Sequence, residues 1–268
     1  MKTDLKSIAG FNLEMDPKKF EIFTDPSIQF KRKTRVAKDL FDVFRTPESI
    51  NPDEKMYYMF YPSNTADRIQ DLFDRTHLTY SLVLIPPKKV GDEFIKTTGH
   101  YHPEKPGTHI AYPEIYLQLY GRLLLLMQKR DPTDDQKIEE VVLYEMKPGD
   151  AVNMLPGYGH CLINHTDEVG LMAGLYSTEF KPFYDPIRIN RGMAYYVIER
   201  EGEIVFEKNP NYPDAPELIK LDKLEGSKFL PPHLGKPVWE MFQKRPEEYE
   251  YLSNPILSRE FHDIQSTE

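Results

Sequence analysis

Four residues of this chain have the side chains and the spacing to hold a metal ion. His100 and His102 stand two apart in Thr-Thr-Gly-His-Tyr-His, so on an extended segment both imidazoles leave the same face. Glu114 follows, and His160 closes the stretch Pro-Gly-Tyr-Gly-His. Three imidazoles and one carboxylate suit Fe²⁺, Mn²⁺, Ni²⁺ or Zn²⁺, and they leave one or two coordination positions open if the ion is five- or six-coordinate. The residue types do not choose among these metals.

Short strands must position these ligands. After residue 77, apolar runs alternate with turn residues at a spacing typical of an antiparallel sandwich or barrel. On the strand that Glu114 begins, Glu114 and Tyr116 share one face and alternate with Ile115 and Leu117. We predict strands at 78–85, 93–98, 114–120, 123–128, 139–146, 151–155, 160–164, 169–176 and 195–199, with a further hairpin strand at 203–206.

The two ends of the chain differ from this central region. Residues 1–55 are charged and carry few strand signals, and apolar residues at helical spacing within 36–44 predict one helix in an irregular arm. We also expect a strand at 56–61, a short helix within 63–73 and another short helix near Trp239. The predicted organisation is an N-terminal extension at 1–76, a barrel at 77–208 and a C-terminal extension at 209–268.

Charge restricts the possible partners. The formal net charge of −9 argues against nucleic acid or an anionic membrane as a partner, so an anionic substrate would need local positive or N–H groups. One basic cluster lies in the N-terminal extension, for which a solvated helix face is the default interpretation and a phosphate-facing patch the alternative. Its members are Lys31, Arg32, Lys33, Arg35 and Lys38.

The sequence predicts a soluble, cytoplasmic protein. Its longest apolar run, 123–127, is far short of the roughly 20 residues that span a bilayer, and its first residues lack the apolar core of a signal peptide. Cys161 is the only cysteine, so no intrachain disulfide can form and an oxidising compartment is not implied.

The order of these motifs resembles a known family. Gly-His-X-His, then a glutamate with a glycine seven residues later, then Pro-Gly-X-Gly-His with Asn164 four residues on, is similar to the two metal motifs of the cupin superfamily. Within it, the stretches 97–102 and 112–116 and the later Gln128 resemble the cupin-type glucose-6-phosphate isomerases, over roughly residues 78–212.

The resemblance implies a cupin double-stranded β-helix, or jelly-roll, barrel and an aldose–ketose isomerase. It implies one divalent metal per subunit, with Fe²⁺ the first choice, held by His100, His102, Glu114 and His160. A sugar phosphate would be the substrate and a homodimer the assembly. The catalytic residues would be Glu114 and Tyr116, and substrate binding would involve Thr97, Gly99, Tyr116, Tyr176, Lys181 and Tyr184.

This chain also departs from the family pattern, which leaves other functions open. Pro182 stands where a histidine is expected, Val83 where a threonine is expected, and the segment between His102 and Glu114 is longer and rich in proline. An isomerase of another sugar is therefore one alternative. A cupin Fe²⁺-dependent dioxygenase and a non-catalytic sugar-binding cupin are the others, because one fold hosts many activities.

Overall fold

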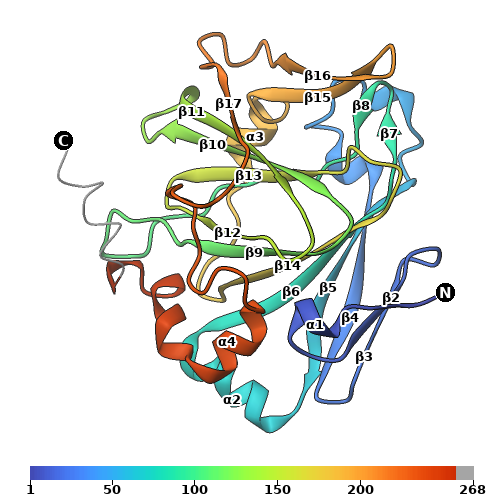
Figure 1. The fold of residues 1–268 in the computed structure, drawn as a ribbon. Coiled ribbons are helices and arrows are strands. Elements are labelled where there is room, and N and C mark those ends of the chain that lie inside the picture. The colour runs from blue at the N-terminus through green and yellow to red at the C-terminus, as the bar shows by residue number, and fades with distance from the viewer. Residues whose placement is uncertain (258–268) are drawn as a thin grey trace.

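The computed structural model describes residues 1–257, and its secondary structure is mainly β (Figure 1). A larger and a smaller sheet face each other across the main core, and short helices and strands from both ends of the chain cover the outside of the larger sheet. This arrangement confirms the predicted mainly β, cupin-type barrel.

The larger sheet has six strands in the order β12-β9-β14-β6-β5-β4, and every neighbouring pair is antiparallel. It places β9, whose first residue is Glu114, between β12 and β14. The strands are β4 (Ile28–Val36), β5 (Lys55–Thr65), β6 (Leu78–Ile85), β9 (Glu114–Tyr120), β12 (Ala151–Met154) and β14 (Gly170–Ser177).

The smaller sheet has four strands in the order β13-β10-β11-β17. Its first three strands are antiparallel, and β17, from the C-terminal region, joins β11 in parallel. The strands are β10 (Leu123–Asp131), β11 (Asp134–Met146), β13 (Tyr158–Ile163) and β17 (Leu218–Leu221).

Two small sheets and several short helices complete the described chain. The N-terminal sheet has the order β1-β2-β3 and the other has the order β16-β15-β8-β7. Their strands are β1 (Thr3–Asp4), β2 (Leu13–Asp16), β3 (Glu21–Thr24), β7 (Lys89–Val90), β8 (Glu93–Phe94), β15 (Tyr195–Arg200) and β16 (Glu203–Lys208). The α-helices are α1 (Lys6–Ala9), α2 (Asp67–Thr76), α3 (Asp185–Ile189) and α4 (Val238–Lys244), and the 3₁₀ helices are η1 (Ala37–Leu40), η2 (Pro47–Ser49), η3 (Pro246–Leu252) and η4 (Pro255–Leu257).

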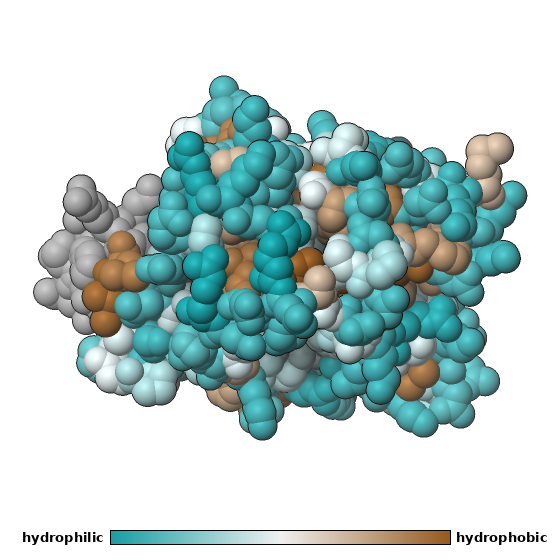
Figure 2. Space-filling view, turned by 90° about the horizontal axis from the view of Figure 1, so that it is seen from below, coloured by the Kyte–Doolittle hydropathy of each residue, from teal (hydrophilic) through white to brown (hydrophobic). Residues whose placement is uncertain are grey.

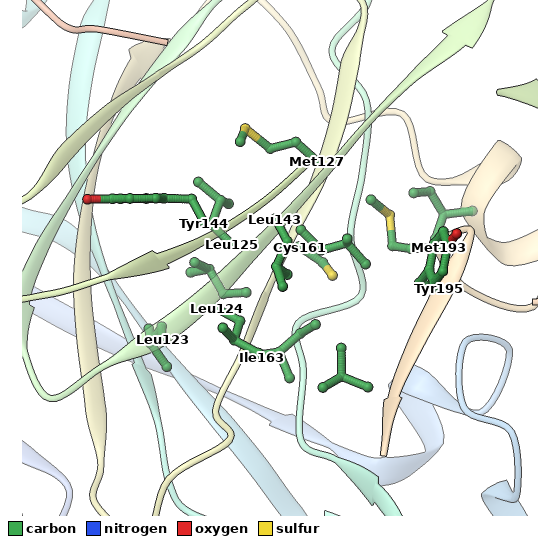
Figure 3. Close-up of a cluster of buried hydrophobic side chains, with 14 of the residues drawn as sticks. Leu123, Leu124, Leu125, Met127, Leu143, Tyr144, Cys161, Ile163, Met193 and Tyr195 are labelled. Atoms are coloured by element: carbon green, nitrogen blue, oxygen red, sulfur yellow. The ribbon is translucent and has the colours of Figure 1, made fainter. Parts of the chain in front are cut away.

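The inner core fills the space between the two large sheets. The same core cluster continues on the other face of the smaller sheet, where Leu143 of β11 and Cys161 of β13 both pair with Leu126 and lie with Met193; Figure 3 shows this part. Cys161 directly follows the candidate ligand His160, and its side chain packs into this apolar cluster. Because side chains alternate along a strand, the same strand that buries Cys161 turns His160 toward the other side.

The outer core lies on the opposite face of the six-stranded sheet. Trp239 of α4 is its centre, with ring centroids 5.8 Å from Phe11, 5.8 Å from Phe73 of α2 and 5.1 Å from Tyr80 of β6. Both ends of the described chain therefore pack on one face of the sheet. Figure 2 views the molecule from the end that carries α2 and α4, and the surface there is mostly hydrophilic with separate apolar areas.

Most predicted strands are confirmed, including two with the predicted bounds, 78–85 and 114–120. The predicted hairpin forms between β15 and β16, where Glu201 and Gly202 both have positive φ, as a tight two-residue turn requires. The strand predicted at 93–98 ends at Phe94, because the chain then runs beside β13 through isolated bridges instead of continuous pairing.

The helix predicted within 36–44 is wrong. Residues 28–36 form strand β4, and only the 3₁₀ turn η1 follows it. The strand β4 itself was not predicted, because it is an edge strand with charged side chains, and such charge hides the period-two pattern. The short helices predicted within 63–73 and near Trp239 form as α2, displaced toward the C-terminus, and as α4.

The three-part division of the chain stays a prediction. The larger sheet includes β4 and β5 from the predicted N-terminal extension, and β17 comes from the predicted C-terminal one. Part of that last extension, 258–268, lies outside the described residues. Within 1–257, none of the helices has both the length and the apolar character needed to cross a membrane.

Candidate metal centre

Three separate segments bring the predicted ligands together. The chain from Ile95 to Tyr101 runs beside β13, and His100 and His160 exchange backbone hydrogen bonds of 3.2 and 3.0 Å. Glu114 begins β9 in the facing sheet. One ligand atom from each of His100, His102, Glu114 and His160 lies within 4.8 Å of all the others.

The separations between these atoms suit ligands of a single ion. The Nε2 atoms of His100 and His102 are 3.1 Å apart, and Glu114 Oε2 lies 3.3 Å from His102 Nε2 and 3.5 Å from His160 Nε2. Ligands at about 2.0–2.2 Å from one metal, at octahedral or tetrahedral angles, are about 3.0–3.5 Å from each other. The four side chains therefore converge as a metal would require.

Neighbouring carbonyls orient two of the imidazoles. His102 Nδ1 lies 2.7 Å from the carbonyl oxygen of Tyr112, and because that oxygen can only accept, Nδ1 donates and leaves the Nε2 lone pair free. His160 Nδ1 lies 3.4 Å from the carbonyl oxygen of Tyr158. The Nε2 atom of His160 is buried without a hydrogen-bond partner, which is the condition expected of a nitrogen that binds a metal.

The surroundings keep the imidazoles neutral and the carboxylate charged. Burial, together with the charges of His160 and His102, holds the pKa of His100 well below its usual value, and burial also lowers the pKa of His160. Burial raises the pKa of Glu114, but contacts with His102 and His160 outweigh it, so the pKa is lower than usual. Neutral imidazoles and an ionised carboxylate are the forms that bind metals.

Aromatic rings surround the cluster. The rings of Tyr116 and His160 meet edge to face at 5.1 Å, and the Tyr184 ring lies 5.6 Å from that of His100. Burial is the largest of the effects that raise the pKa of the Tyr116 hydroxyl well above its usual value, so this hydroxyl stays protonated. Tyr176 pairs with Glu114 across the neighbouring strands, on the same face of the sheet.

The remaining predicted substrate residues lie in different surroundings. Thr97 Oγ1 accepts a hydrogen bond of 3.1 Å from the backbone N–H of Leu162. Gly99 has a φ of +75°, and a Cβ there would lie 3.2 Å from Cys161 Cβ, so the position suits glycine. Lys181 is exposed, outside the cluster of four ligands. Tyr101, which lies between His100 and His102 in the sequence, turns away from the ligands, and its hydroxyl accepts a hydrogen bond of 2.8 Å from Gln128.

Two contributors to the site were not predicted. The ring centroid of Phe180 lies 4.3 Å from that of His102 and 5.0 Å from that of Tyr112, so Phe180 packs against the proposed ligand His102. Gly174 of β14 lies beside Glu114, since a Cβ built there would stand 2.8 Å from Glu114 Oε1. A glycine inside a strand pattern is a signal of close approach and could have identified Gly174, whereas nothing in the sequence indicates Phe180.

The long segment between His102 and Glu114 is tied to the body of the protein. Lys105 donates a hydrogen bond of 2.9 Å to Glu179 and one of 2.8 Å to the carbonyl oxygen of Ser253. The backbone N–H of Tyr112 donates to the carbonyl oxygen of Pro103, which closes the segment on itself. The segment thus holds the Tyr112 carbonyl against His102.

The family model and the curated relatives that match this chain carry the same name. Residues 34–214 match the family model described as "Glucose-6-phosphate isomerase (GPI)". A protein named glucose-6-phosphate isomerase from Thermococcus litoralis is 30% identical over 186 residues, which cover 68% of this chain and 88% of the relative. A protein of the same name from Pyrococcus abyssi is 28% identical over 165 residues, which cover 62% of this chain and 77% of that relative. Among solved structures, the vicilin from Solanum melongena has a TM-score of 0.37 at 12% identity, over 59% of this chain and 32% of that one, which is too distant to inform the function.

Proposed function

This chain belongs to the glucose-6-phosphate isomerase family and is an enzyme of that family, and from this premise we propose that its isomerase activity depends on a divalent metal. The proposed ligands are His100, His102, Glu114 and His160, and the reaction is the interconversion of glucose 6-phosphate and fructose 6-phosphate. The observation that carries the metal dependence is the convergence of these four side chains within 4.8 Å. Fe²⁺ is the proposed native ion, with Mn²⁺, Ni²⁺ and Zn²⁺ as the alternatives.

The chemistry of the reaction assigns tasks to residues of the site. Interconverting an aldose and a ketose moves a proton between C1 and C2 of the sugar and develops negative charge on an oxygen. A bound divalent ion would stabilise that charge as a Lewis acid. The protein must supply a base near the two carbons, and a donor that keeps its proton while the oxyanion forms.

Glu114 is the proposed base. Its lowered pKa leaves the carboxylate ionised near neutral pH, so that it can accept a proton. Oε2 faces His102 and His160, whereas Oε1 faces Gly174, so one oxygen is turned away from the imidazoles. Tyr116, whose raised pKa keeps its hydroxyl protonated, is the proposed hydrogen-bond donor to the developing oxyanion.

Substrate contacts are proposed for Thr97, Gly99, Tyr176, Lys181 and Tyr184. Tyr176 and Tyr184 are supported by their place beside Glu114 and His100. Thr97, Gly99 and Lys181 rest on the family resemblance alone. A cytoplasmic location and a homodimer also stay predictions.

Metal removal and return test the proposal. Purified protein stripped with a chelator should lose conversion of fructose 6-phosphate to glucose 6-phosphate, and reloading with Fe²⁺, Mn²⁺, Ni²⁺ or Zn²⁺ should restore it to different extents. Full activity in protein shown to be free of metal would contradict metal dependence. Folded, metal-loaded protein without turnover would contradict the proposed substrates and direct attention to another sugar or to oxygen chemistry.

Solvent deuterium distinguishes two routes for the hydrogen. Proton transfer through Glu114 exchanges with water, so the product formed in D₂O should carry deuterium at the carbon that receives the proton. A hydride shift between C1 and C2 would leave the product without solvent deuterium. Mass spectrometry of the sugar phosphate measures the difference.

A further inference from the structure

The edge strand β4 carries a row of cationic side chains. Lys31, Lys33 and Arg35 alternate along it and therefore leave the same face of the six-stranded sheet. We call these three residues the β4 cationic row. Arg32 lies between them in sequence and leaves the opposite face.

Strand register identifies the face on which the row lies. Arg35 pairs with Tyr57 and Lys33 with Met59, both of which pack on the inner core between the two large sheets. Directly opposed residues of an antiparallel pair project from the same face, so the row belongs to the inner side of the sheet. Arg32 instead pairs with Phe60 of the outer core and lies over the Tyr58 ring at 5.3 Å.

Arg35 lies near the metal centre. Its charge opposes the rise that burial causes in the pKa values of Tyr57 and Tyr184. Tyr57 hydrogen-bonds to Thr98, two residues before His100, and the Tyr184 ring is the one that lies 5.6 Å from the His100 ring. The charge of Arg35 therefore lies within electrostatic range of two tyrosines that adjoin the proposed ligands.

The row has no anionic partner of its own. Within residues 1–257, none of Lys31, Lys33 and Arg35 takes part in an ion pair, although acidic residues outnumber basic ones in the sequence. The Nε atom of Arg35 is buried and makes no hydrogen bond. Arg35 as a whole is only partly buried, so the remaining N–H groups of its guanidinium can pair with an anionic ligand.

We propose that the β4 cationic row binds the phosphate group of the substrate, with Arg35 as the principal contact. The proposal rests on the proposed function, since it names the group that would recognise the anionic end of the sugar phosphate. A phosphate monoester carries nearly two negative charges at neutral pH, and the forked guanidinium of arginine matches its oxygens. Lys33 and Lys31 continue the positive charge along the rim toward solvent.

The test compares Arg35→Met and Arg35→Lys with the control Arg32→Met. All three change one side chain on the same strand, but Arg32 faces the outer core. With metal-loaded protein, Arg35→Met should raise KM for fructose 6-phosphate roughly 10- to 100-fold, the expected loss for one charge-assisted contact, while kcat changes far less. Arg35→Lys keeps the positive charge but loses the forked guanidinium, so its KM should lie between those of Arg35→Met and the wild type. The control should stay within about twofold of the wild type, as expected of a surface change away from the site.

A second readout distinguishes anion binding from a structural effect. Inorganic phosphate should inhibit the wild-type enzyme competitively, and Arg35→Met should raise its inhibition constant by a factor similar to that for KM. Metal content and thermal midpoint should be the same in wild type and Arg35→Lys. Equal inhibition of the wild type and Arg35→Met by phosphate would overturn the proposal.

Calorimetric measurement of sugar-phosphate binding tests the phosphate contact independently of the isomerase activity. If wild-type protein binds fructose 6-phosphate without converting it, and Arg35→Met weakens that binding tenfold or more, the isomerase assignment fails and the phosphate contact stands. If wild-type protein is active but Arg35→Met binds the sugar phosphate as tightly, the contact is wrong and the isomerase assignment stands. If wild-type protein binds neither phosphate nor sugar phosphate, the contact is also wrong.

Discussion

At the scale of single residues, one carboxylate has two possible tasks. Glu114 Oε2 is close to two of the three imidazoles, and the same side chain is the proposed base. A metal ligand and a base make different demands, because a ligand needs only an oxygen lone pair whereas a base must take up a proton. Glutamine separates them, since its amide oxygen can still coordinate but cannot accept a proton at neutral pH.

Glu114→Gln should therefore reduce kcat by about 10²- to 10⁴-fold, the usual contribution of a positioned base, in protein that still holds metal. Turnover and metal content of the same sample measure the two effects. Glu104→Gln, which removes an exposed carboxylate from the neighbouring segment, is the matched control and should keep full activity. An active, metal-loaded Glu114→Gln enzyme would show that the base lies elsewhere.

At the scale of secondary structure, strand pairing determines the room around the ligands. Gly174 on β14 is paired with Tyr116 on β9, and its missing side chain leaves the space that Glu114 Oε1 fills. Residues that orient a metal-binding side chain affect the affinity for the metal even though they do not contact the ion. The backbone at Gly174 does not require glycine for conformational reasons, so only the space matters.

Gly174→Ala should displace the Glu114 carboxylate and weaken metal binding roughly 10- to 100-fold, as supporting substitutions around metal sites do. Competition with a chelator of known affinity measures the loss. Ala173→Gly alters the adjacent position, which faces the outer core, and should leave the metal affinity unchanged. Unaltered metal affinity in Gly174→Ala would mean that the carboxylate moves freely or does not bind the ion.

At the scale of the whole molecule, the ends of the chain stabilise the barrel from outside. The Trp239 ring contacts aromatic rings from the N-terminal segment, from α2 and from β6, all on the face of the sheet opposite the proposed metal ligands. This layer buries the outer side of β9 and β14, whose inner sides carry Glu114 and Tyr176. Stability and ligand geometry therefore depend on opposite faces of the same strands.

Trp239→Ala should lower the free energy of unfolding by about 3–5 kcal/mol, the usual cost of deleting a buried tryptophan. Urea denaturation measures this loss, and the metal affinity of the protein that remains folded should be close to wild type. Ile189→Ala, at a position 73% exposed, should change the free energy of unfolding by no more than about 0.5 kcal/mol. A loss of metal binding in folded Trp239→Ala would mean that the outer layer also sets the ligand geometry.

The sequence by itself determined the features that depend on local pattern. The bounds 114–120 for the Glu114 strand followed from strict alternation, and the proposed ligand set followed from spacing within two short motifs. These features can be read from the sequence because side chains two apart on an extended segment share a face, whatever they pack against.

Only the tertiary structure decided the features that depend on which strands become neighbours. From the sequence, the default interpretation of the basic cluster at 31–38 was a solvated helix face. The structure instead places three of its members on the inner side of a sheet edge, where Lys31, Lys33 and Arg35 lie opposite Tyr61, Met59 and Tyr57. Gly174 and Phe180 likewise reach the ligands through pairing and packing between distant segments. Contacts of this kind are set by burial and register over the whole chain, and local composition does not encode them.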